Sequence, residues 1–216
     1  DLGSNSFHLL IGRLEHGEIK PVHTLAEKVQ LGAGLNRRKL SQNAIERGLA
    51  CLKQFAQLLK SVEPSRIRVV GTHALRRANN RQEFTQPAEH ILGVPIDVVY
   101  GREEARPIYL GVAHALADDE RSRLVVDIGG GSTEFIVGRR FEPTRLESLQ
   151  LGCVSYADAY FPNGKISKRR FCNAYEKAMI EVSHIRKHYS SKHWSEAVGS
   201  SGTLQAIETL IRINGW

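Results

Sequence analysis

The fold is decided by residues 124–134, which read Leu-Val-Val-Asp-Ile-Gly-Gly-Gly-Ser-Thr-Glu. The apolar run that begins at Leu124 and ends in glycines is typical of a buried strand of a parallel sheet. A second strand is expected directly after the turn, starting at Phe135. The glycines allow backbone N–H groups to approach a phosphate closely, and Asp127 at the strand end is a suitable ligand for Mg²⁺. The alternative is a plain hairpin turn with a solvated aspartate.

The same pattern occurs a second time in the chain. Residues 1–6 (DLGSNS) and 127–132 (DIGGGS) share Asp, an aliphatic residue, Gly, two variable residues and Ser, and each stretch precedes a strand that carries an aromatic residue. A third Gly/Ser turn, at 199–203 (GSSGT), opens the final helix. Three loops of this type favour phosphate binding over a simple turn. Two like units facing one another would place such loops on either side of a cleft.

Strands and helices alternate along the rest of the chain. Strands are expected over 7–11, 19–24, 67–71 and 95–100, with a hairpin turn at Glu15-His16-Gly17. Helices are expected over 41–60 behind a Ser41 cap, over 103–116 with Pro107 in the first turn, and over 168–189. One face of the helix over 168–189 carries six apolar side chains: Phe171, Tyr175, Ala178, Met179, Val182 and Ile185. This alternation predicts an α/β fold with domains at 1–120 and 121–216, divided at a polar stretch.

Composition narrows the class of protein. Of 216 residues 41% are hydrophobic and 25% are charged, which is ordinary for a globular protein. No apolar run reaches the roughly 18–20 residues of a membrane span, and no basic-then-apolar leader opens the sequence. The three cysteines lie too far apart for a disulfide framework or a zinc site. We therefore expect reduced thiols in a cytoplasmic protein.

The charge is unevenly distributed. Thirty basic and 23 acidic residues give +7, and residues 165–192 alone hold eight basic and two acidic residues, or +6. Between Gly101 and Glu134 seven acids outnumber four arginines. A protein that handles a metal–phosphate substrate has a use for both regions, although most charge runs are solvated helix faces. The basic region lacks an RNP-like aromatic pattern, zinc fingers and a recognition helix, so nucleic acid is not the expected partner.

Other common active-site signatures are absent from the sequence. There is no HExxH zinc motif, no GxSxG elbow and no GxxxxGK[ST] phosphate loop. The stretch Gly101-Arg102-Glu103-Glu104 instead opens a helix with two acids. Their side chains diverge by about 100°, so only one can face a substrate as a general base, while the other stabilises the helix N-terminus. An ordinary acidic first turn is the alternative. The basic turn at 72–77 (THALRR) is a candidate for holding phosphate, or a solvated turn.

Six motifs occur in the order DLGSNSFH (1–8), GTHALR (71–76), GREEAR (101–106), DIGGGSTE (127–134), LGCVSY (151–156) and GSSGT (199–203). Together they resemble the exopolyphosphatase/guanosine pentaphosphate phosphohydrolase family, within the actin-like, sugar-kinase and Hsp70 superfamily. The resemblance covers essentially the whole chain. It implies two actin-like, ribonuclease-H-like domains around a cleft, and hydrolysis of a terminal phosphoanhydride with Mg²⁺.

The resemblance also implies the roles of single residues. Glu104 matches the catalytic base of the family, Asp127 and Glu134 its metal-site acids, and Arg76 its phosphate-binding arginine. The remaining phosphate-binding residues implied are Gly3, Ser4, Asn5, Ser6, Gly129, Gly130, Gly131, Ser132, Gly199, Ser200, Ser201, Gly202 and Thr203.

Family members have a half-strand before the position of Asp1 and complete their second domain beyond Trp216. We therefore expect this sequence to be a fragment of a longer protein. The resemblance implies that the longer protein is a homodimer. The expected substrate is inorganic polyphosphate, with guanosine pentaphosphate as the alternative. The choice rests on a basic track of Lys165, Lys168, Arg169 and Arg170 along which a long polyanion would displace its counterions. A rival hypothesis from another class is a nucleotide- or polyphosphate-responsive sensor without chemistry, which would have no need for Glu104.

Overall fold

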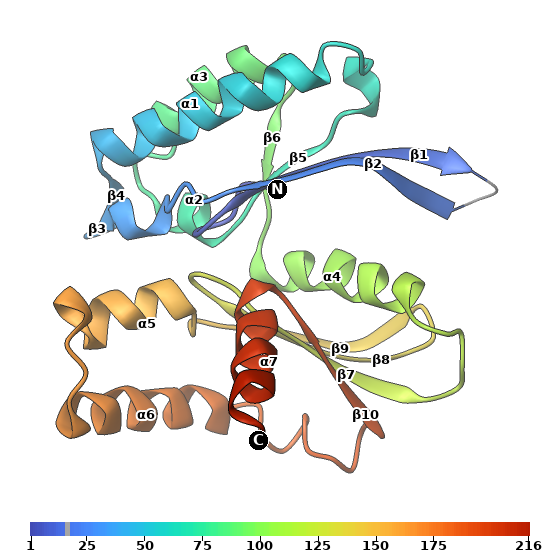
Figure 1. Ribbon diagram of the computed structural model, residues 1–216, viewed down its shortest axis with the longest axis vertical. Helices are drawn as coiled ribbons and strands as arrows, with labels where there is room; N and C mark the ends of the chain where they lie inside the picture. The colour runs from blue at the N-terminus through green and yellow to red at the C-terminus, as the bar shows by residue number, and fades with distance from the viewer. Residues whose placement is uncertain (16–17) are drawn as a thin grey trace. The chain divides into compact units, whose positions relative to one another are not determined.

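In a computed structural model that describes residues 1–15 and 18–216, the chain forms two compact units, Asp1–Val99 and Tyr100–Trp216 (Figure 1). Each unit has its own sheet and its own hydrophobic core. The sequence placed the division after residue 120. The difference is helix α4 (Gly101–Ala115), whose apolar side packs on the sheet of the second unit.

Among the described residues the first unit contains three strand pairs, two of which flank its opening loop. Strands β1 (Phe7–Glu15) and β2 (Glu18–Glu27) run antiparallel, and β5 (Val69–Gly71) and β6 (Ile96–Val98) run parallel. Leu2 makes a bridge to Phe7 on one side and to Gly71 on the other, so the opening loop is fixed between the two pairs. Two residues of the expected hairpin turn, His16 and Gly17, lie outside the described residues.

Helices cover these strands. The predicted helix behind Ser41 is confirmed as α1 (Gln42–Leu59), and the Ser41 hydroxyl accepts a hydrogen bond from the Ala44 N–H at 3.4 Å. Its buried side includes Ile45, Leu52 and Phe55. The remaining elements of the unit are β3 (Leu35–Asn36), β4 (Lys39–Leu40), α2 (His73–Arg77), α3 (Gln82–Leu92) and the 3-10 turns η1 (Gly32–Gly34) and η2 (Pro64–Arg66).

The second unit is built on a four-stranded sheet. The strands are β7 (Ser122–Ile128), β8 (Thr133–Arg139), β9 (Glu142–Leu149) and β10 (Glu196–Ser200), in the spatial order β10-β7-β8-β9. The predicted strand into the glycine turn is therefore present as β7. It pairs in parallel with β10 and antiparallel with β8, so the sheet is mixed.

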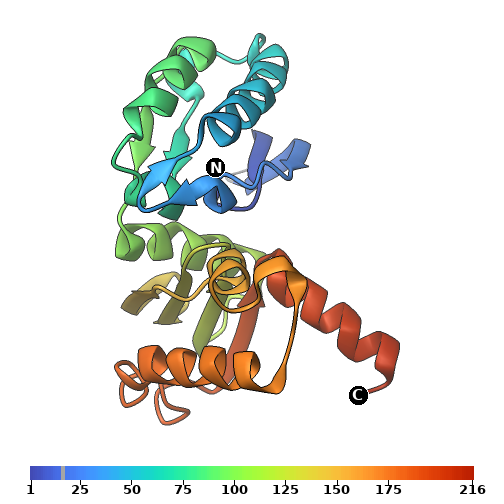
Figure 2. The same cartoon turned by 90° about the vertical axis from the view of Figure 1, so that its left-hand side faces the viewer.

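The register of this sheet gives it an apolar row. Val198, Val125, Ile136 and Leu146 are direct cross-strand partners on four neighbouring strands. Partners of this kind project from the same face. Helix α4 packs on this row through Ala105 and Tyr109, and Figure 2 shows the helix along one face of the sheet.

Tyr109 fixes the position of α4 because a glycine lies beneath it. A Cβ placed on Gly138 would lie 2.3 Å from the Tyr109 ring, and the tyrosine hydroxyl donates to the Arg140 carbonyl at 3.0 Å. The expectation that Pro107 lies in the first helical turn is wrong, because α4 begins at Gly101 and contains Pro107 in its interior. The proline has no N–H for the carbonyl of Glu103, four residues earlier.

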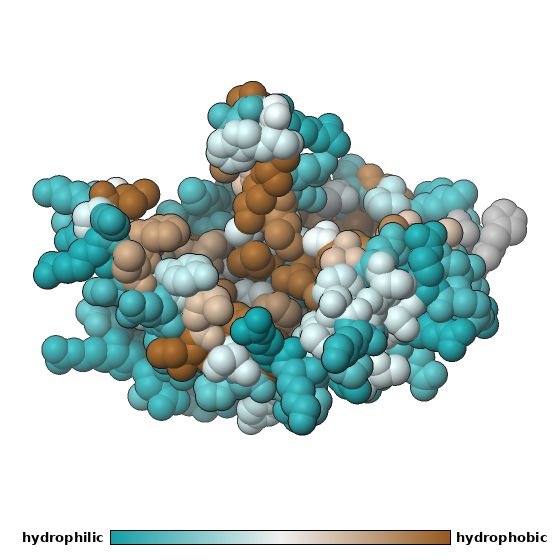
Figure 3. All heavy atoms as spheres, turned by 90° about the horizontal axis from the view of Figure 1, so that it is seen from below, coloured by the Kyte–Doolittle hydropathy of each residue, from teal (hydrophilic) through white to brown (hydrophobic). Residues whose placement is uncertain are grey.

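The remaining helices are α5 (Cys153–Tyr160), α6 (Lys168–Ser183) and α7 (Gly202–Asn214), with the 3-10 turn η3 (Pro162–Gly164) between α5 and α6. On the apolar face predicted for 168–189, Phe171, Tyr175 and Met179 are exposed, whereas Ile185 is buried. The Phe171 and Tyr175 rings stack with centroids 6.5 Å apart. Apolar side chains of α7 are exposed as well. Figure 3 shows apolar groups along this projecting helix and in the hollow at its foot. No helix among the described residues is long and apolar enough to cross a membrane.

The contact between Tyr109 and Gly138 gives a first prediction. Gly138→Ala should destabilise the protein by about 1–3 kcal/mol, because the new methyl group overlaps the tyrosine ring. Gly111→Ala is the matched control, since a Cβ there meets no atom within 4 Å and alanine favours the helix by about 0.5–1 kcal/mol. The free energy of unfolding from denaturant titration measures both. Equal effects of the two substitutions would contradict the packing described.

Candidate active site

The polar residues of the second unit form a row at the end of its sheet. Ser200, Asp127, Glu134 and Ser148 are direct cross-strand partners on β10, β7, β8 and β9. The row lies two residues along each strand from the apolar row, so it projects from the same face, the one that α4 covers. Two acids that are separated by the glycine turn in sequence thus become neighbours in space.

Glu134 is the most buried acid of the row, with 1% of its surface exposed. Burial and the charge of Glu104 raise its pKa from 4.5 to about 7, and Asp127 adds to this rise. Hydrogen bonds from Ser148 and Ser132 act in the opposite direction, and the Ser148 hydroxyl donates to Oε1 of Glu134 at 2.8 Å. The site therefore brings carboxylates together in a place where a negative charge is poorly solvated.

Asp127 is in a similar position at the end of β7. Burial raises its pKa, and a hydrogen bond from the Ser200 side chain acts in the opposite direction. Each acid of the row is therefore flanked by a serine that hydrogen-bonds to it.

The first turn of α4 separates the roles of its two acids. The Tyr100 N–H donates to Oε2 of Glu103 at 3.1 Å, so Glu103 caps the helix and remains exposed. Glu104 is half-buried and is close enough to Glu134 to raise the pKa of that group. Arg102 pairs with Glu147 of β9 at 2.9 Å and so ties the start of the helix to the sheet. Of the two acids, Glu104 is the one that approaches the row.

The glycine turn is held by the start of α5. The Gly129 carbonyl accepts from the Cys153 N–H, and the Gly130 carbonyl accepts from the next two N–H groups, at 2.9–3.0 Å. A Cβ on Gly152 would lie 2.4 Å from the backbone of Gly131, so the two segments touch. Peptides here are trans, and a carbonyl that points to α5 turns the N–H of the same peptide away from it. The N–H groups of Gly130 and Gly131 therefore point away from α5, as a phosphate cradle requires.

The third predicted loop, residues 199–203, lies beside Asp127 and the start of α5. The Ser200 side chain hydrogen-bonds to Asp127, and the Thr203 hydroxyl lies 3.5 Å from the Cys153 sulfur. Ser201 has a positive φ of 94°, and its buried hydroxyl has no hydrogen-bond partner within the described part of the chain. Strand β10 ends at Ser200 and α7 begins at Gly202, so the loop joins this strand to a helix N-terminus.

The remaining predicted phosphate-binding residues belong to the first unit. In the loop Gly3–Ser6 the Gly3 N–H donates to the Ser6 carbonyl, while the Ser4 and Asn5 carbonyls accept from Gly32 and Gln30. The buried Ser4 hydroxyl has no hydrogen-bond partner among residues 1–15 and 18–216. Arg76 donates to the Val99 carbonyl at 2.7 Å.

The basic track lies at the outer end of the α5–α6 hairpin. Lys165, Lys168 and Arg169 are exposed, and Arg170 donates to the Lys165 carbonyl at 2.9 Å. Helix α5 starts at the glycine turn and rises about 12 Å over its eight residues before the connection to α6 (Figure 1). The track is therefore separated from the glycine turn by the length of α5.

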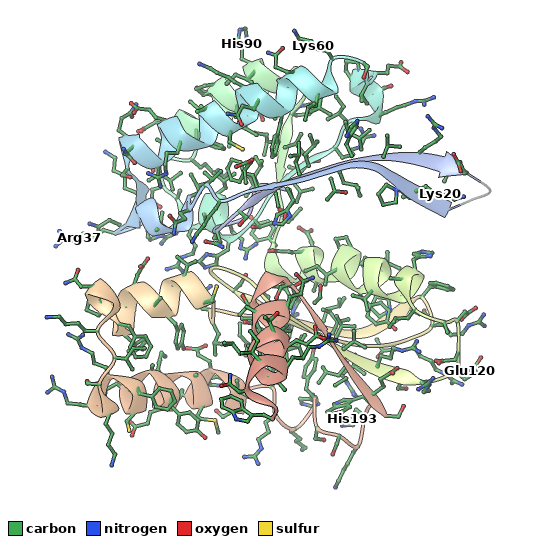
Figure 4. All side chains as sticks on the ribbon, viewed as in Figure 1. Lys20, Arg37, Lys60, His90, Glu120 and His193 are labelled. Carbon is green, nitrogen blue, oxygen red and sulfur yellow. The ribbon has the colours of Figure 1, made fainter. Side chains whose placement is uncertain are left out.

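Most acids of the 101–134 region lie away from the row. The Arg123 side chain, 5% exposed, bonds to Asp119 at 2.8 Å and to Glu196 at 2.7 Å, at the opposite end of β7. Glu120, labelled in Figure 4, pairs with Arg139 and Arg140 at that same end of the sheet. These acids stabilise the sheet, and only Asp127 and Glu134 of β7 and β8 contribute to the row.

The chemistry of the row fits a hard divalent cation. Two adjacent, poorly solvated carboxylates are oxygen ligands whose repulsion a cation would relieve, and Mg²⁺ commonly uses one or two carboxylates with waters and substrate phosphates. Among the described residues no group of three or more His, Cys, Asp or Glu is arranged to hold a metal ion. Asp127 and Glu134 are the two carboxylates of the row that would hold such a cation.

Sequence reasoning did not single out Ser148. It lies in β9, in the stretch Glu147-Ser148-Leu149, and strand alternation alone places it on one face or the other. Its partnership with Glu134 depends on the register of β9 against β8, which includes a shift between Val137 and Gly138. The sequence offered one indication: Ser148 lies two residues after the apolar Leu146, so strand alternation places both on the same face.

Comparisons with known proteins agree with the motifs. A family model described as the Ppx/GppA phosphatase family matches residues 10–215. A guanosine-5'-triphosphate,3'-diphosphate pyrophosphatase of Vibrio vulnificus is 44% identical over 216 residues, covering 100% of this chain and 43% of the relative. A putative exopolyphosphatase of Haemophilus influenzae is 41% identical over 215 residues, covering 99% and 66%. The chain thus spans less than half of the first relative.

A solved structure shows the same fold. The crystal structure of an exopolyphosphatase-like protein superposes with a TM-score of 0.91 at 27% identity, over 98% of this chain and 67% of that one. The predicted α/β fold of the actin-like ATPases is confirmed.

The pKa of Glu134 gives a second prediction. Because it is about 7 in the folded protein and 4.5 ordinarily, the folded state binds more protons between these values. Without divalent cations, the unfolding free energy should therefore fall as the pH rises from 4.5 to 7, by roughly 3 kcal/mol from this group. Glu134→Gln should remove that slope, as measured by urea titrations across this pH range.

The control is Glu142→Gln, which changes an exposed acid at the start of β9. If the slope of the Glu134→Gln variant equals that of the parent, the charge of Glu134 is not the destabilising group.

Proposed function

Because this chain belongs to the Ppx/GppA phosphatase family, we propose that the protein hydrolyses the terminal phosphoanhydride bond of a polyphosphorylated substrate. The observation that carries the proposal is the row of Asp127 and Glu134 between the glycine turn and Glu104. This arrangement would combine a phosphate cradle, a cation site and a candidate base within one unit. The chain spans 43% of the first relative, and the activity is proposed for the protein as a whole.

In the proposed reaction, Glu104 accepts a proton from the attacking water. The water oxygen bonds to the terminal phosphorus as the bridging P–O bond breaks, which releases orthophosphate and a shortened substrate. The N–H groups of Gly130 and Gly131 orient the terminal phosphate. Bound Mg²⁺, held by Asp127 and Glu134, would supply charge neutralisation for the transferring phosphoryl group.

Two facts favour an enzyme over a sensor. Glu104 lies close enough to the buried Glu134 to raise the pKa of that carboxyl, a placement that phosphate binding alone does not require. The relatives carry the names of hydrolases.

For the substrate we favour inorganic polyphosphate. The exposed cations Lys165, Lys168 and Arg169 lie beyond the far end of α5, so the length of this helix separates them from the glycine turn. A long anion can span that separation better than a nucleotide. The relative from Haemophilus influenzae is named a putative exopolyphosphatase. Guanosine pentaphosphate is the second candidate, because the Vibrio vulnificus relative is named for it and is slightly more similar.

A third prediction concerns the base. Glu104→Gln should lower the turnover of phosphate release by a factor of about 10²–10⁴ while substrate binding is kept, since a general base contributes in that range. Glu103→Gln is the matched control, because this neighbouring acid only caps the helix. Phosphate release and equilibrium binding of polyphosphate are measured for both. Similar losses of turnover in the two variants would refute the assignment of Glu104.

A fourth prediction concerns the substrate. Binding of long polyphosphate should weaken steeply with salt, as for other polyanions that release counterions. Replacing Lys168, Arg169 and Arg170 with glutamine should flatten this dependence and weaken long chains more than short ones. A control of equal charge change replaces the exposed residues Arg186, Lys187 and Lys192.

Affinity is measured over a salt series with long and short chains. Equal slopes for the two triple variants would reject the basic track. A parent that hydrolyses guanosine pentaphosphate more efficiently than polyphosphate would reverse the choice of substrate.

A further inference from the structure

We propose that Ser148 and Ser200 are positioning residues that hold Glu134 and Asp127 as a pair for one divalent cation. The inference deepens the proposed function and rests on it for the identity of the cation site. It assigns Ser200 to a carboxylate, whereas the sequence assigned this residue to phosphate.

The register of the sheet is the first part of the argument. In the row Ser200, Asp127, Glu134 and Ser148, each serine is the outer cross-strand partner of an acid. Side chains that are direct partners on neighbouring strands lie about 5 Å apart at Cβ, so a short serine side chain reaches the carboxylate beside it. The two serines therefore flank the acids from opposite sides.

The hydrogen bonds are the second part. The Ser148 hydroxyl lies 2.8 Å from Oε1 of Glu134, and the Ser200 side chain is hydrogen-bonded to Asp127. A buried carboxylate has few alternative partners, so each fixed donor restricts how its oxygens are oriented. Glu134 also receives a hydrogen bond from Ser132, on its own strand's side of the glycine turn. Outer partners of this kind commonly set the orientation of metal-ligating carboxylates.

The position of Ser200 depends on the edge strand that carries it. At the other end of β10, Glu196 bonds to the buried Arg123 of β7 at 2.7 Å and so fixes the strand in its register. Within residues 1–15 and 18–216 β10 pairs with β7 alone, so this ion pair and the five paired positions hold Ser200 beside Asp127.

The test measures cation binding directly. Mn²⁺ is titrated into the protein without substrate, and free Mn²⁺ is followed by electron paramagnetic resonance. At each serine, Val and Thr variants are compared, since the two side chains have nearly the same shape and only Thr keeps the hydroxyl. Ser148→Val and Ser200→Val should each weaken Mn²⁺ binding about tenfold, whereas the Thr variants should bind as the parent does.

Two further variants calibrate the result. Asp127→Asn should abolish most Mn²⁺ binding, because it removes the negative charge of one ligand. The control is Thr144→Val, on the same strand as Ser148. The Thr144 hydroxyl donates to the Val137 carbonyl at 2.9 Å and not to an acid, so its removal should leave Mn²⁺ binding unchanged. Thermal melts confirm that each variant is folded.

Several outcomes would overturn the inference. One is unchanged Mn²⁺ affinity in both Val variants, and another is a parent that binds no Mn²⁺ at millimolar concentration. A third is weaker binding of inorganic phosphate with unchanged Mn²⁺ binding, which would make the serines phosphate ligands. Failure of the proposed function is distinct, because serine-dependent Mn²⁺ binding without phosphate release from polyphosphate or guanosine pentaphosphate would refute only the hydrolase.

Discussion

The cross-strand register of β10-β7-β8-β9 is the constraint on which the second unit depends. One set of partners places Val198, Val125, Ile136 and Leu146 under α4, and the next set on that face places Ser200, Asp127, Glu134 and Ser148 at the strand ends. A slip of one residue on any strand would turn its side chains to the opposite face. The packing that fixes the core therefore also fixes the pair of acids.

The same arrangement explains the electrostatics. Helix α4 packs on the apolar row through Tyr109 over Gly138, and this brings Glu104 to Glu134, which is almost fully buried. Carboxylates held close together away from water favour protonation or a cation over two free charges. The hydrogen bonds from Ser148 and Ser200 offset only part of this cost. The packing of α4 on the sheet thus stabilises a fold in which these carboxylates stay close together. A bound divalent cation would neutralise their charge, and a phosphorylated substrate would then bind to the cation.

Much of this organisation could be predicted from the sequence. The run from Leu124 to the glycines identified β7 and its turn, and the order of six motifs indicated the family. Helix geometry left open which of Glu103 and Glu104 faces the site, and only the family resemblance favoured Glu104. The choice depends on a helix start at Gly101 and a hydrogen bond from Tyr100. Ser148 was missed because strand register is a property of the folded sheet. The apolar side chains of 168–189 predicted one helical face but not the surface that it meets, and Phe171 and Tyr175 on this face are exposed.

The central claim is that Asp127 and Glu134 act together on one cation, and its most direct measurement is a crystal structure of the protein grown with Mn²⁺. The account predicts a single anomalous peak where β7 ends and β8 begins, with an oxygen of each carboxylate about 2.1 Å from the ion. Ser148 and Ser200 would still be hydrogen-bonded to the outer oxygens. A cation bound by only one of the two acids, or bound elsewhere while the row is empty, would contradict it.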